Sequence, residues 1–321
     1  ASGGTGTSYT NQQSVSNLSS TNGATVNLYA QWSSAYASIT LPTLNNRNTG
    51  GYFYSPLGWY NNTSLTTKLG NGGASYTPTA STTIYAGWEL VYTRGTLNSD
   101  NYNITPSASG EYIHFGSFPQ FTTDVASTGK YETISGTNYY YAPILWKIID
   151  SSSGLICSEY IIGWRSGFKA DNSSVYYSAS DLRTYMESIY TNNLTAAQKA
   201  VIKTKAVSES SASSISSSAY DMALTTSDHI YPITATQANS TWTSSSTRRK
   251  YVTPYAYALG CNRNTSYSKT VNSTTLYSGY WWLRTRYSSS IVFYVHDGGS
   301  INRITPNASS PGAVPACTIA L

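Results

Sequence analysis

The segment from Trp281 to Arg303 holds the side chains of this sequence that are best suited to binding a ligand without changing it chemically. Apolar residues recur along the segment, and we expect them to fix its backbone by packing in a core: Trp281, Trp282, Leu283, Ile291, Val292, Val295 and Ile301. Between them stand residues that can offer aromatic area, guanidinium donors or short polar groups to a partner. These twelve predicted binding residues are Thr285, Arg286, Tyr287, Ser288, Ser289, Ser290, Phe293, Tyr294, His296, Asp297, Asn302 and Arg303. Each also fits an ordinary exposed loop position.

The sequence contains no residues in the pattern of a known catalytic or metal site. Its three isolated histidines and few carboxylates form no HExxH motif, no GxSxG elbow and no acid–base pair that spacing identifies. Cys157, Cys261 and Cys317 lie far apart and lack metal-ligand spacing. We therefore expect no catalysis, no cofactor and no metal. Each cysteine is expected to be a buried, small apolar residue, although a Cys261–Cys317 bridge stays open.

The composition points to a polar surface with few charges. Asp, Glu, Lys and Arg make up only 10% of the residues, whereas 30 residues are Tyr. Tyr with Ser, Gly and Asn is typical of antibody-type recognition loops, because Tyr gives a large contact area with few rotatable bonds. Tyr and Thr also favour strands, so the composition fits a β-rich exported protein equally well.

The charge pattern argues against nucleic acid as a partner. The net charge is +5, but the 19 basic residues are scattered, and only Arg248-Arg249-Lys250 forms a run. No stretch approaches the roughly 18 apolar residues of a membrane span, so no membrane insertion is expected. The chain begins at Ala1 rather than Met, and we expect any export signal or anchor to lie outside it.

The elements that must position the segment are predicted to form a mixed α+β domain. Apolar runs predict strands within residues 142–149 and 155–158, with further strands or short turns near 230–234 and 280–283. Helical spacing of Leu182, Met186 and Ile189 predicts one helix. Thr195 and Gln198 form a capping box for a second helix.

Several residues and segments have a structural interpretation. Adjacent Trp281 and Trp282 are expected in the core, because two indoles left in water would expose a large apolar area. His114 is expected to be a packed histidine rather than a ligand. Residues 91–110 are polar and irregular and are interpreted as a linker or insertion. The Ser-rich residues 208–218 are interpreted as a loop.

An internal repeat occupies the N-terminal part of the chain. VNLYAQW (26–32) and TIYAGW (83–88) end alike, and short alternating runs separated by Gly and Asn turns precede the second. The unit over 36–90 resembles the Listeria–Bacteroides repeat of bacterial surface proteins, a small β-grasp-like module, and residues 1–35 match its second half only. The resemblance implies spacer modules in an exported protein. Their aromatic residues are expected to pack on strand faces.

Six motifs in order carry a second resemblance, which covers residues 111–321. They are FGSFPQ (115–120), ILWKIID (144–150), LICSEYII (155–162), SDLRTYM (180–186), DHIYPITATQA (228–238) and YWWLRT (280–285). They are similar to a bacterial surface-domain family known mainly as a domain of unknown function, which resembles the C-type-lectin-like variable proteins diversified by retroelements. This chain departs from the family's tail pattern at Val314, where the family usually has Arg.

This resemblance implies a C-type-lectin-like head whose changing side chains line a solvent-facing concavity. The twelve predicted binding residues would then bind a protein ligand on another cell, or on a phage or host surface. The protein would be extracellular or on a cell surface, and a phage or virus particle is a further possible location. Adenine-directed mutation of AAC-type codons cannot readily produce Lys, Glu, Gln, Met or Trp, and residues 283–321 contain none of these five types.

Three other functions stay open. A calcium-dependent, sugar-binding lectin would need clustered oxygen ligands, and beyond Asp297 the sequence offers little of this kind. The formylglycine-generating oxidases share the lectin-like fold, but their chemistry needs two closely spaced cysteines. A purely structural adhesin with an invariant terminal domain is expected if the segment packs flat against the core.

Overall fold

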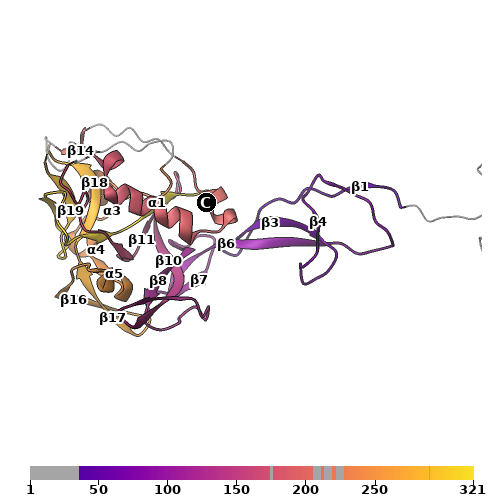
Figure 1. Cartoon of the computed structure of the whole chain (residues 1–321), viewed down its shortest axis with the longest axis horizontal. Helices are drawn as coiled ribbons and strands as arrows, with labels where there is room; N and C mark the ends of the chain where they lie inside the picture. Colours follow the sequence, from indigo (N-terminus) through magenta and orange to yellow (C-terminus); the bar gives the residue numbers. More distant parts are fainter. Residues whose placement is uncertain (1–35, 174–175, 205–210, 213–218, 222–227, 289) are drawn as a thin grey trace, which may run out of the picture. The chain divides into compact units, whose positions relative to one another are not determined.

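The computed structural model describes residues 36–173, 176–204, 211–212, 219–221, 228–288 and 290–321 (Figure 1). The partial repeat predicted for residues 1–35 lies outside the described residues, as does most of the Ser-rich segment 208–218. The described residues form a β-rich fold with a few short helices. They fall into two compact units. The smaller unit comprises the described residues up to Leu44 together with Gly58–Gly87, and the larger comprises Asn45–Leu57 with Trp88–Leu321.

The smaller unit is built from short antiparallel strands. Strand β1 (Ile39–Thr40) pairs with β5 (Ser75–Tyr76), and β4 (Lys68–Gly70) pairs with the end of β3 (Tyr52–Tyr60). Leu41 is buried, and the Trp59 indole donates a hydrogen bond to the Pro42 carbonyl at 2.7 Å. Aromatic and apolar side chains therefore hold the strands of this unit together.

The main sheet of the larger unit brings distant parts of the chain side by side. Its strands run in the order β2-β3-β6-β8-β10-β11-β22, with β7 paired to β6 and β9 paired to β10. Their bounds are β2 Arg47–Thr49, β6 Tyr85–Leu97, β7 Ile104–Pro106, β8 Tyr112–Phe121, β9 Tyr131–Ile134, β10 Thr137–Asp150, β11 Leu155–Ser158 and β22 Ala316–Thr318. Strand β22 thus joins the end of the described chain to a strand formed about 160 residues earlier, through the register Ile156↔Cys317.

The interpretation of residues 91–110 as a linker is wrong. Strand β6 continues to Leu97, turns at residues 98–103 and pairs with β7, and β6 also pairs with β8. The Tyr102 side chain is buried, and its hydroxyl donates a hydrogen bond to the Pro143 carbonyl at 2.7 Å. The polar residues belong to the turn, where the Asp100 carboxylate accepts hydrogen bonds from the backbone of Tyr102 and Asn103. A hairpin turn resembles a linker in composition.

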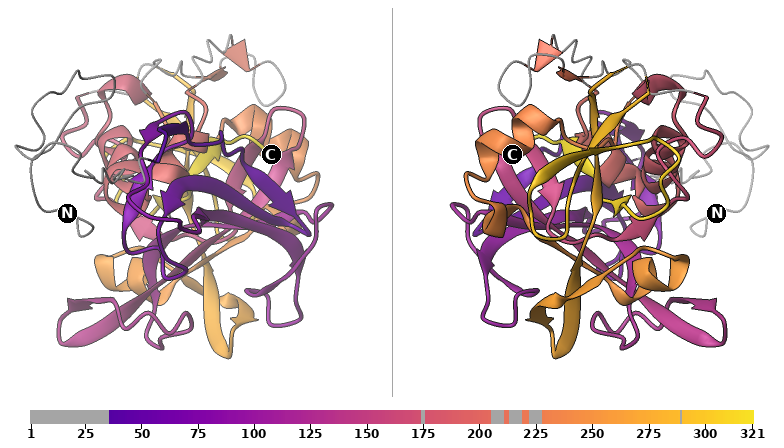
Figure 2. Two further views of the ribbon diagram at one scale, coloured as in Figure 1. Left: turned by 90° about the vertical axis from the view of Figure 1, so that its right-hand side faces the viewer. Right: turned by 90° about the vertical axis from the view of Figure 1, so that its left-hand side faces the viewer.

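A second sheet of the larger unit is centred on β18 (Trp281–Arg286). Strand β18 pairs in parallel with β21 (Gly312–Ala313) and antiparallel with β19 (Val292–Val295), which pairs in turn with β20 (Ile301–Ile304). Beyond these lie β12 (Gly163–Trp164), β13 (Ser211–Ala212) and β14 (Ala219–Asp221). Figure 2 (right) shows the late strands, in yellow, on the side of the larger unit that faces the viewer.

A third, three-stranded sheet has the order β15-β17-β16, with bounds Lys250–Val252, Thr274–Gly279 and Asn264–Val271. It is antiparallel throughout. Strand β15 follows directly from the helical segment that ends at Arg248, and it begins at Lys250, the last residue of the basic run.

The two predicted helices are confirmed. Helix α1 spans Asp181–Asn193, is capped by Ser180 and buries Leu182, Met186 and Ile189. Helix α2 spans Ala196–Val201 behind the expected capping box. The structure adds the short helices η1 (Tyr177–Ala179), α3 (Ala235–Thr241), α4 (Ser245–Arg248) and α5 (Pro254–Leu259). None of the helices in the described part of the chain is long and apolar enough to cross a membrane.

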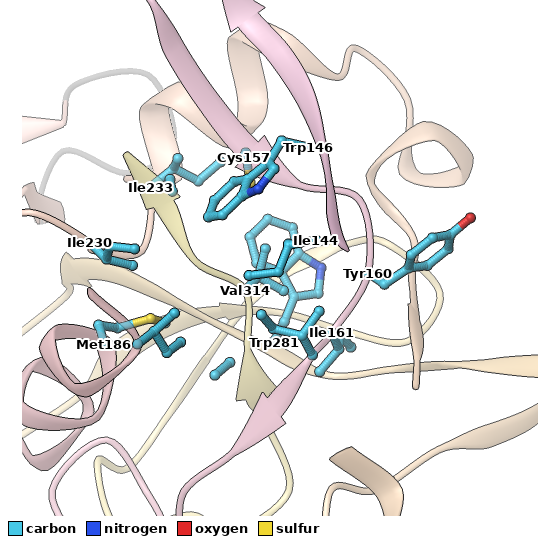
Figure 3. Close-up of a cluster of buried hydrophobic side chains, with 14 of the residues drawn as sticks. Ile144, Trp146, Cys157, Tyr160, Ile161, Met186, Ile230, Ile233, Trp281 and Val314 are labelled. Carbon is cyan, nitrogen blue, oxygen red and sulfur yellow. The ribbon is translucent and has the colours of Figure 1, made fainter. Parts of the chain in front are cut away.

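The core of the larger unit contains most of the residues that were expected to be buried, whereas the predicted anchors Ile291 and Ile301 are only half-buried. Figure 3 shows Ile144, Trp281 and Val314 gathered at its centre, and Trp282 is equally inaccessible. The three cysteines are buried and free, so the Cys261–Cys317 bridge is not formed. Burial raises the pKa of the Cys157 thiol to about 11 and that of Cys261 to about 12, which makes both thiols unreactive.

Candidate functional site

Strands β18, β19 and β20 bring most of the twelve predicted binding residues together. Cross-strand pairing sets Phe293 opposite Arg303 and Tyr294 opposite Asn302. The loop after β18 holds Tyr287, whose backbone N–H donates a hydrogen bond to the Ile291 carbonyl at 2.9 Å. Ser288 and Ser290 lie in the same loop, and Ser289 is outside the described residues. We call the exposed and half-buried side chains of these strands and their loops the β18–β20 surface.

Thr285 is not part of the β18–β20 surface, so its assignment as a binding residue is corrected. Its side chain is 0% exposed, and its hydroxyl accepts a hydrogen bond at 2.7 Å from the backbone N–H of Ala235, the first residue of α3. The first N–H groups of a helix lack partners within the helix. Thr285 therefore completes the end of a helix that is distant in sequence.

Phe293 is likewise inaccessible, at 2% exposure. All four residues of β19 are buried, so both faces of this strand are covered. A strand covered on both faces does not alternate between core and solvent. The Phe293 ring packs edge-on against Tyr287, with 5.7 Å between ring centroids. Phe293 therefore packs against Tyr287 and is not accessible to a ligand.

Tyr287, Phe293 and Arg303 form the Tyr287 cluster. The Arg303 guanidinium lies 4.3 Å from the centroid of the Tyr287 ring, a cation–π distance. Arg303 is exposed and forms no ion pair with any residue that the structure describes. Nearby, Arg286 stacks at 4.6 Å on the Tyr176 ring. The cluster therefore presents a guanidinium fork on an aromatic base, an arrangement common at the centres of protein interfaces.

Tyr280, Tyr294, His296, Asp297 and Asn264 form the Asp297 cluster. Asp297 is 5% exposed, and both of its carboxylate oxygens are engaged. One lies 2.6 Å from His296 Nδ1, and the other accepts a hydrogen bond at 2.7 Å from the Asn264 side chain. The Tyr280 ring lies 4.7 Å from the His296 ring and 5.7 Å from that of Tyr294. These contacts hold the side chains in one fixed arrangement.

The two tyrosines of the Asp297 cluster stay protonated at neutral pH. Burial raises the pKa of Tyr280, and the negative charge of Asp297 raises it further. Burial also raises the pKa of Tyr294. Both hydroxyls are therefore hydrogen-bond donors as well as acceptors, and the cluster offers recognition by hydrogen bonds rather than a reactive phenolate.

A cavity of about 280 Å³ opens beside the Asp297 cluster. It is lined by Asn262, Arg263, Asn264, Thr265, Gly279, Tyr280 and Asp297. Arg263 stacks on the Tyr257 ring at 3.7 Å. The amide, guanidinium, phenol and carboxylate groups that line the cavity converge on a space large enough for one side chain of a partner. We call this the Asp297 cavity.

The sequence reasoning missed most of the residues lining the Asp297 cavity. Arg263 and Asn264 are 33 or more residues away from Asp297, and they come near it only in the folded chain, where the Asn264 side chain donates a hydrogen bond to Asp297. Tyr280 is half-exposed. Its exposure was not predicted, because in the YWWLRT motif it stands next to two indoles that were expected in the core. Among the described residues, no group of three His, Cys, Asp or Glu side chains could hold a metal ion.

Comparison with known proteins adds one match. A family model described as a domain of unknown function, DUF6273, matches residues 151–321. The matched region contains both the Tyr287 cluster and the Asp297 cluster. No curated protein and no solved structure matches the chain.

Proposed function

We propose that this chain, which belongs to the DUF6273 family, is an exported receptor- or adhesin-type protein. It is proposed to bind a protein ligand at its β18–β20 surface. The observation that carries the proposal is the Tyr287 cluster. Arg303 is an exposed cation without a carboxylate partner among the described residues, and it is held on an aromatic ring that is itself braced from below by Phe293. Tyrosine and arginine are among the residue types enriched in interface hot spots.

Binding at this surface is proposed to be non-covalent. The Asp297 cavity beside it accepts polar groups, while the Tyr287 cluster supplies aromatic area and guanidinium donors. The three free cysteines are buried, and their raised pKa values make them poor nucleophiles. These features suit recognition better than catalysis.

We propose further that the larger unit has a C-type-lectin-like fold and that the smaller unit is a β-grasp-like spacer. The support is the order of the six sequence motifs and their positions on the elements of one unit. FGSFPQ lies in β8, ILWKIID in β10, SDLRTYM at the start of α1 and YWWLRT in β18. Extracellular or cell-surface display follows from the same resemblance.

Retroelement-driven diversification of this surface is also proposed, and it would concern fewer residues than the twelve first predicted. Asn302 and Arg303 are exposed, and Arg286, Tyr287 and Ser288 are partly so, whereas Thr285, Phe293, Tyr294 and Asp297 are buried. Backbone pairing between β18, β19 and β20 holds the surface. Exposed side chains on such a framework can change with little cost in stability.

The proposal is tested by labelling a panel of intact bacterial cells with the fluorescent protein. Tyr287→Ala and Arg303→Ala should each reduce labelling of a responsive strain by about tenfold or more, because hot-spot truncation typically costs 2 kcal/mol or above. Thermal unfolding should stay near the wild-type midpoint, since both side chains are at the edge of the core.

Matched controls exist in the same unit. Tyr131 packs edge-on against Tyr140 with 5.5 Å between centroids, as Tyr287 does against Phe293, and Arg47 lies 4.7 Å from the Trp88 ring. Tyr131→Ala and Arg47→Ala should label cells normally. Equal labelling by all four variants would contradict a β18–β20 binding surface and favour an invariant structural adhesin.

A further inference from the structure

A second cavity of the larger unit, distinct from the β18–β20 surface, has a volume of about 570 Å³. Its wall combines β8, β10, β15, β16 and the segment that contains α4. The lining residues are Tyr112, Lys147, Glu159, Thr241, Trp242, Thr243, Ser246, Thr247, Arg249, Lys250, Tyr251 and Lys269. We call it the Lys250 pocket. It shares no lining residue with the Asp297 cavity.

Lys250 is a buried cation without an anionic partner. Its side chain belongs to a residue that is 3% exposed, and its ammonium donates hydrogen bonds to the carbonyls of Ser158 at 2.6 Å and Glu159 at 3.4 Å. The ammonium also lies 4.8 Å from the centroid of the Trp242 ring. No carboxylate of a described residue comes within 4.0 Å of it. Burying a charge among neutral partners is costly, and an entering anion would offset that cost.

The rim of the Lys250 pocket adds three more cations. Lys269 lies 3.7 Å from the Glu159 carboxylate, and Lys147 lies 3.9 Å from Glu111, which is not a lining residue. Arg249 stacks on the Tyr267 ring at 3.9 Å. The lining therefore contains four cations and one carboxylate, a net charge of +3 in a protein that is otherwise poor in charge. A cleft lined by one sign of charge concentrates ligands of the opposite sign.

The remaining lining favours a ligand that is rich in hydroxyl groups and has an apolar face. Thr241, Thr243, Ser246 and Thr247 supply hydroxyls that both donate and accept hydrogen bonds. Tyr112, Trp242 and Tyr251 supply aromatic surface. The volume is in the range of ordinary small-molecule sites and has room for one or two sugar rings.

We infer that the Lys250 pocket binds an acidic sugar, with the sugar's carboxylate directed to Lys250 and its hydroxyls to the Thr and Ser side chains of the α4 segment. Inorganic anions would satisfy the cations but leave the aromatic and hydroxyl lining unused. Neutral sugars would leave Lys250 without a counterion. The pocket thus requires both features in one ligand.

Isothermal titration of the full chain with digalacturonate tests this inference, with the dimethyl ester of the same disaccharide as the uncharged probe and inorganic phosphate as the sugar-free anion. Digalacturonate should bind at least about tenfold more tightly than either. Its affinity should fall as salt increases, because the rim cations are exposed to screening.

Two kinds of variant connect this binding to the pocket. Lys250→Met should weaken digalacturonate at least about thirtyfold, as expected when one partner of a buried charge pair is removed. Lys147→Gln with Lys269→Gln, both at the partly exposed rim, should weaken it about tenfold without affecting folding. Lys130→Gln is the matched control, because Lys130 stacks on Tyr141 outside the pocket, and it should bind as the wild type does.

The inference is overturned if the dimethyl ester or phosphate binds as tightly as digalacturonate, or if the Lys147→Gln and Lys269→Gln double variant keeps full affinity. Tyr287→Ala should leave digalacturonate binding unchanged. Cell labelling and sugar binding can therefore fail independently of each other.

Discussion

Buried polar side chains of the larger unit act mainly as partners for backbone groups. The Arg284 guanidinium donates a hydrogen bond to the Pro232 carbonyl at 2.8 Å, and the Gln120 amide donates to the Ala142 carbonyl at 2.9 Å. The Thr285 hydroxyl accepts from the first residue of α3. Each such group would cost free energy if it were left without a partner. Residues of this kind determine how the loops meet the sheets.

His114 also pairs with a backbone group, and it makes the stability of the fold depend on pH. Its Nε2 lies 3.0 Å from the Tyr102 carbonyl, and burial lowers the pKa of the imidazole from 6.5 to about 4. The unfolded chain binds this proton near pH 6.5, but the folded chain binds it only near pH 4. Stability from His114 is therefore complete above pH 6.5 and is lost as the pH falls towards 4, by up to about 3 kcal/mol.

Urea unfolding at pH 7.5 and pH 4.5 measures this effect. The wild type should lose more free energy of unfolding between the two pH values than His114→Gln, whose amide can still donate to the Tyr102 carbonyl but does not titrate. The comparison with His114→Gln cancels every pH-dependent contribution that the two proteins share. An equal loss in both proteins would show that His114 is not the group responsible.

At the residue scale, apolar burial could be predicted from the sequence, and several polar contacts could not. Trp281, Trp282 and the cysteines are buried because side chains of these types lose free energy when they are removed from water into a core. Thr285 and Phe293 look like binding residues because Thr and aromatic side chains suit either environment. Their burial depends on α3 and on the position of β19 inside its sheet, which are tertiary features.

Strand connections in the larger unit depend on where glycine is placed. Gly154, between β10 and β11, has φ +80°, and a Cβ there would lie 2.0 Å from the Ile319 carbonyl oxygen. The backbone N–H of Ile319 donates to the Gly154 carbonyl at 3.0 Å, so the turn contacts the residue that follows β22. A side chain would disrupt this contact as well as strain the backbone.

Gly154→Ala should therefore lower the free energy of unfolding by about 3 kcal/mol or more, combining left-handed strain with a clash against backbone. Gly136, between β9 and β10, is the matched control: its φ is +81°, and nothing lies within 4 Å of its added Cβ. Gly136→Ala should cost only the strain, about 1 kcal/mol. Chemical denaturation measures both, and equal losses would rule out the clash at Ile319.

Element prediction succeeded where the signal was local. Helix α1 follows from its apolar spacing and α2 from its capping box. A second capping box, formed by Thr234 and Gln237, precedes α3. The apolar run before it led instead to the prediction of a strand or short turn near residues 230–234. The β6–β7 hairpin was missed because its turn is as polar as a linker.

For the molecule as a whole, the two compact units do not coincide with continuous stretches of sequence. Residues 45–57 were assigned to the repeat, yet they belong to the larger unit, where Phe53 stacks on Tyr92 with 4.8 Å between centroids. The Arg94 N–H also donates to the Gly51 carbonyl at 2.6 Å. Contacts between residues this far apart in the sequence leave no local sequence pattern, so the resemblance to a repeat could not reveal them.

The division predicts that the smaller unit can be removed. Leu57 and Trp88 are the residues at which the chain leaves and re-enters the larger unit, on the neighbouring strands β3 and β6. A chain that starts at Asn45, with an Asn-Gly turn replacing Gly58–Gly87, should keep the larger unit folded, because this turn favours hairpins. Calorimetry should show its unfolding midpoint within about 4 °C of the corresponding transition in the full chain, which corresponds to a change below about 1 kcal/mol. A chain without a cooperative transition would contradict two separable units.

The pairing of β22 with β11 has a consequence for how variants of this protein could arise. Translation reaches residues 316–318 after the whole β18–β20 surface, so the main sheet is completed only once those residues have left the ribosome. Any insertion or deletion that shifts the reading frame in the codons of that surface also rewrites β22. Such products would lack an edge strand of the main sheet and should not reach the native fold. Chains with point changes on the surface would therefore fold, whereas frameshifted chains would not.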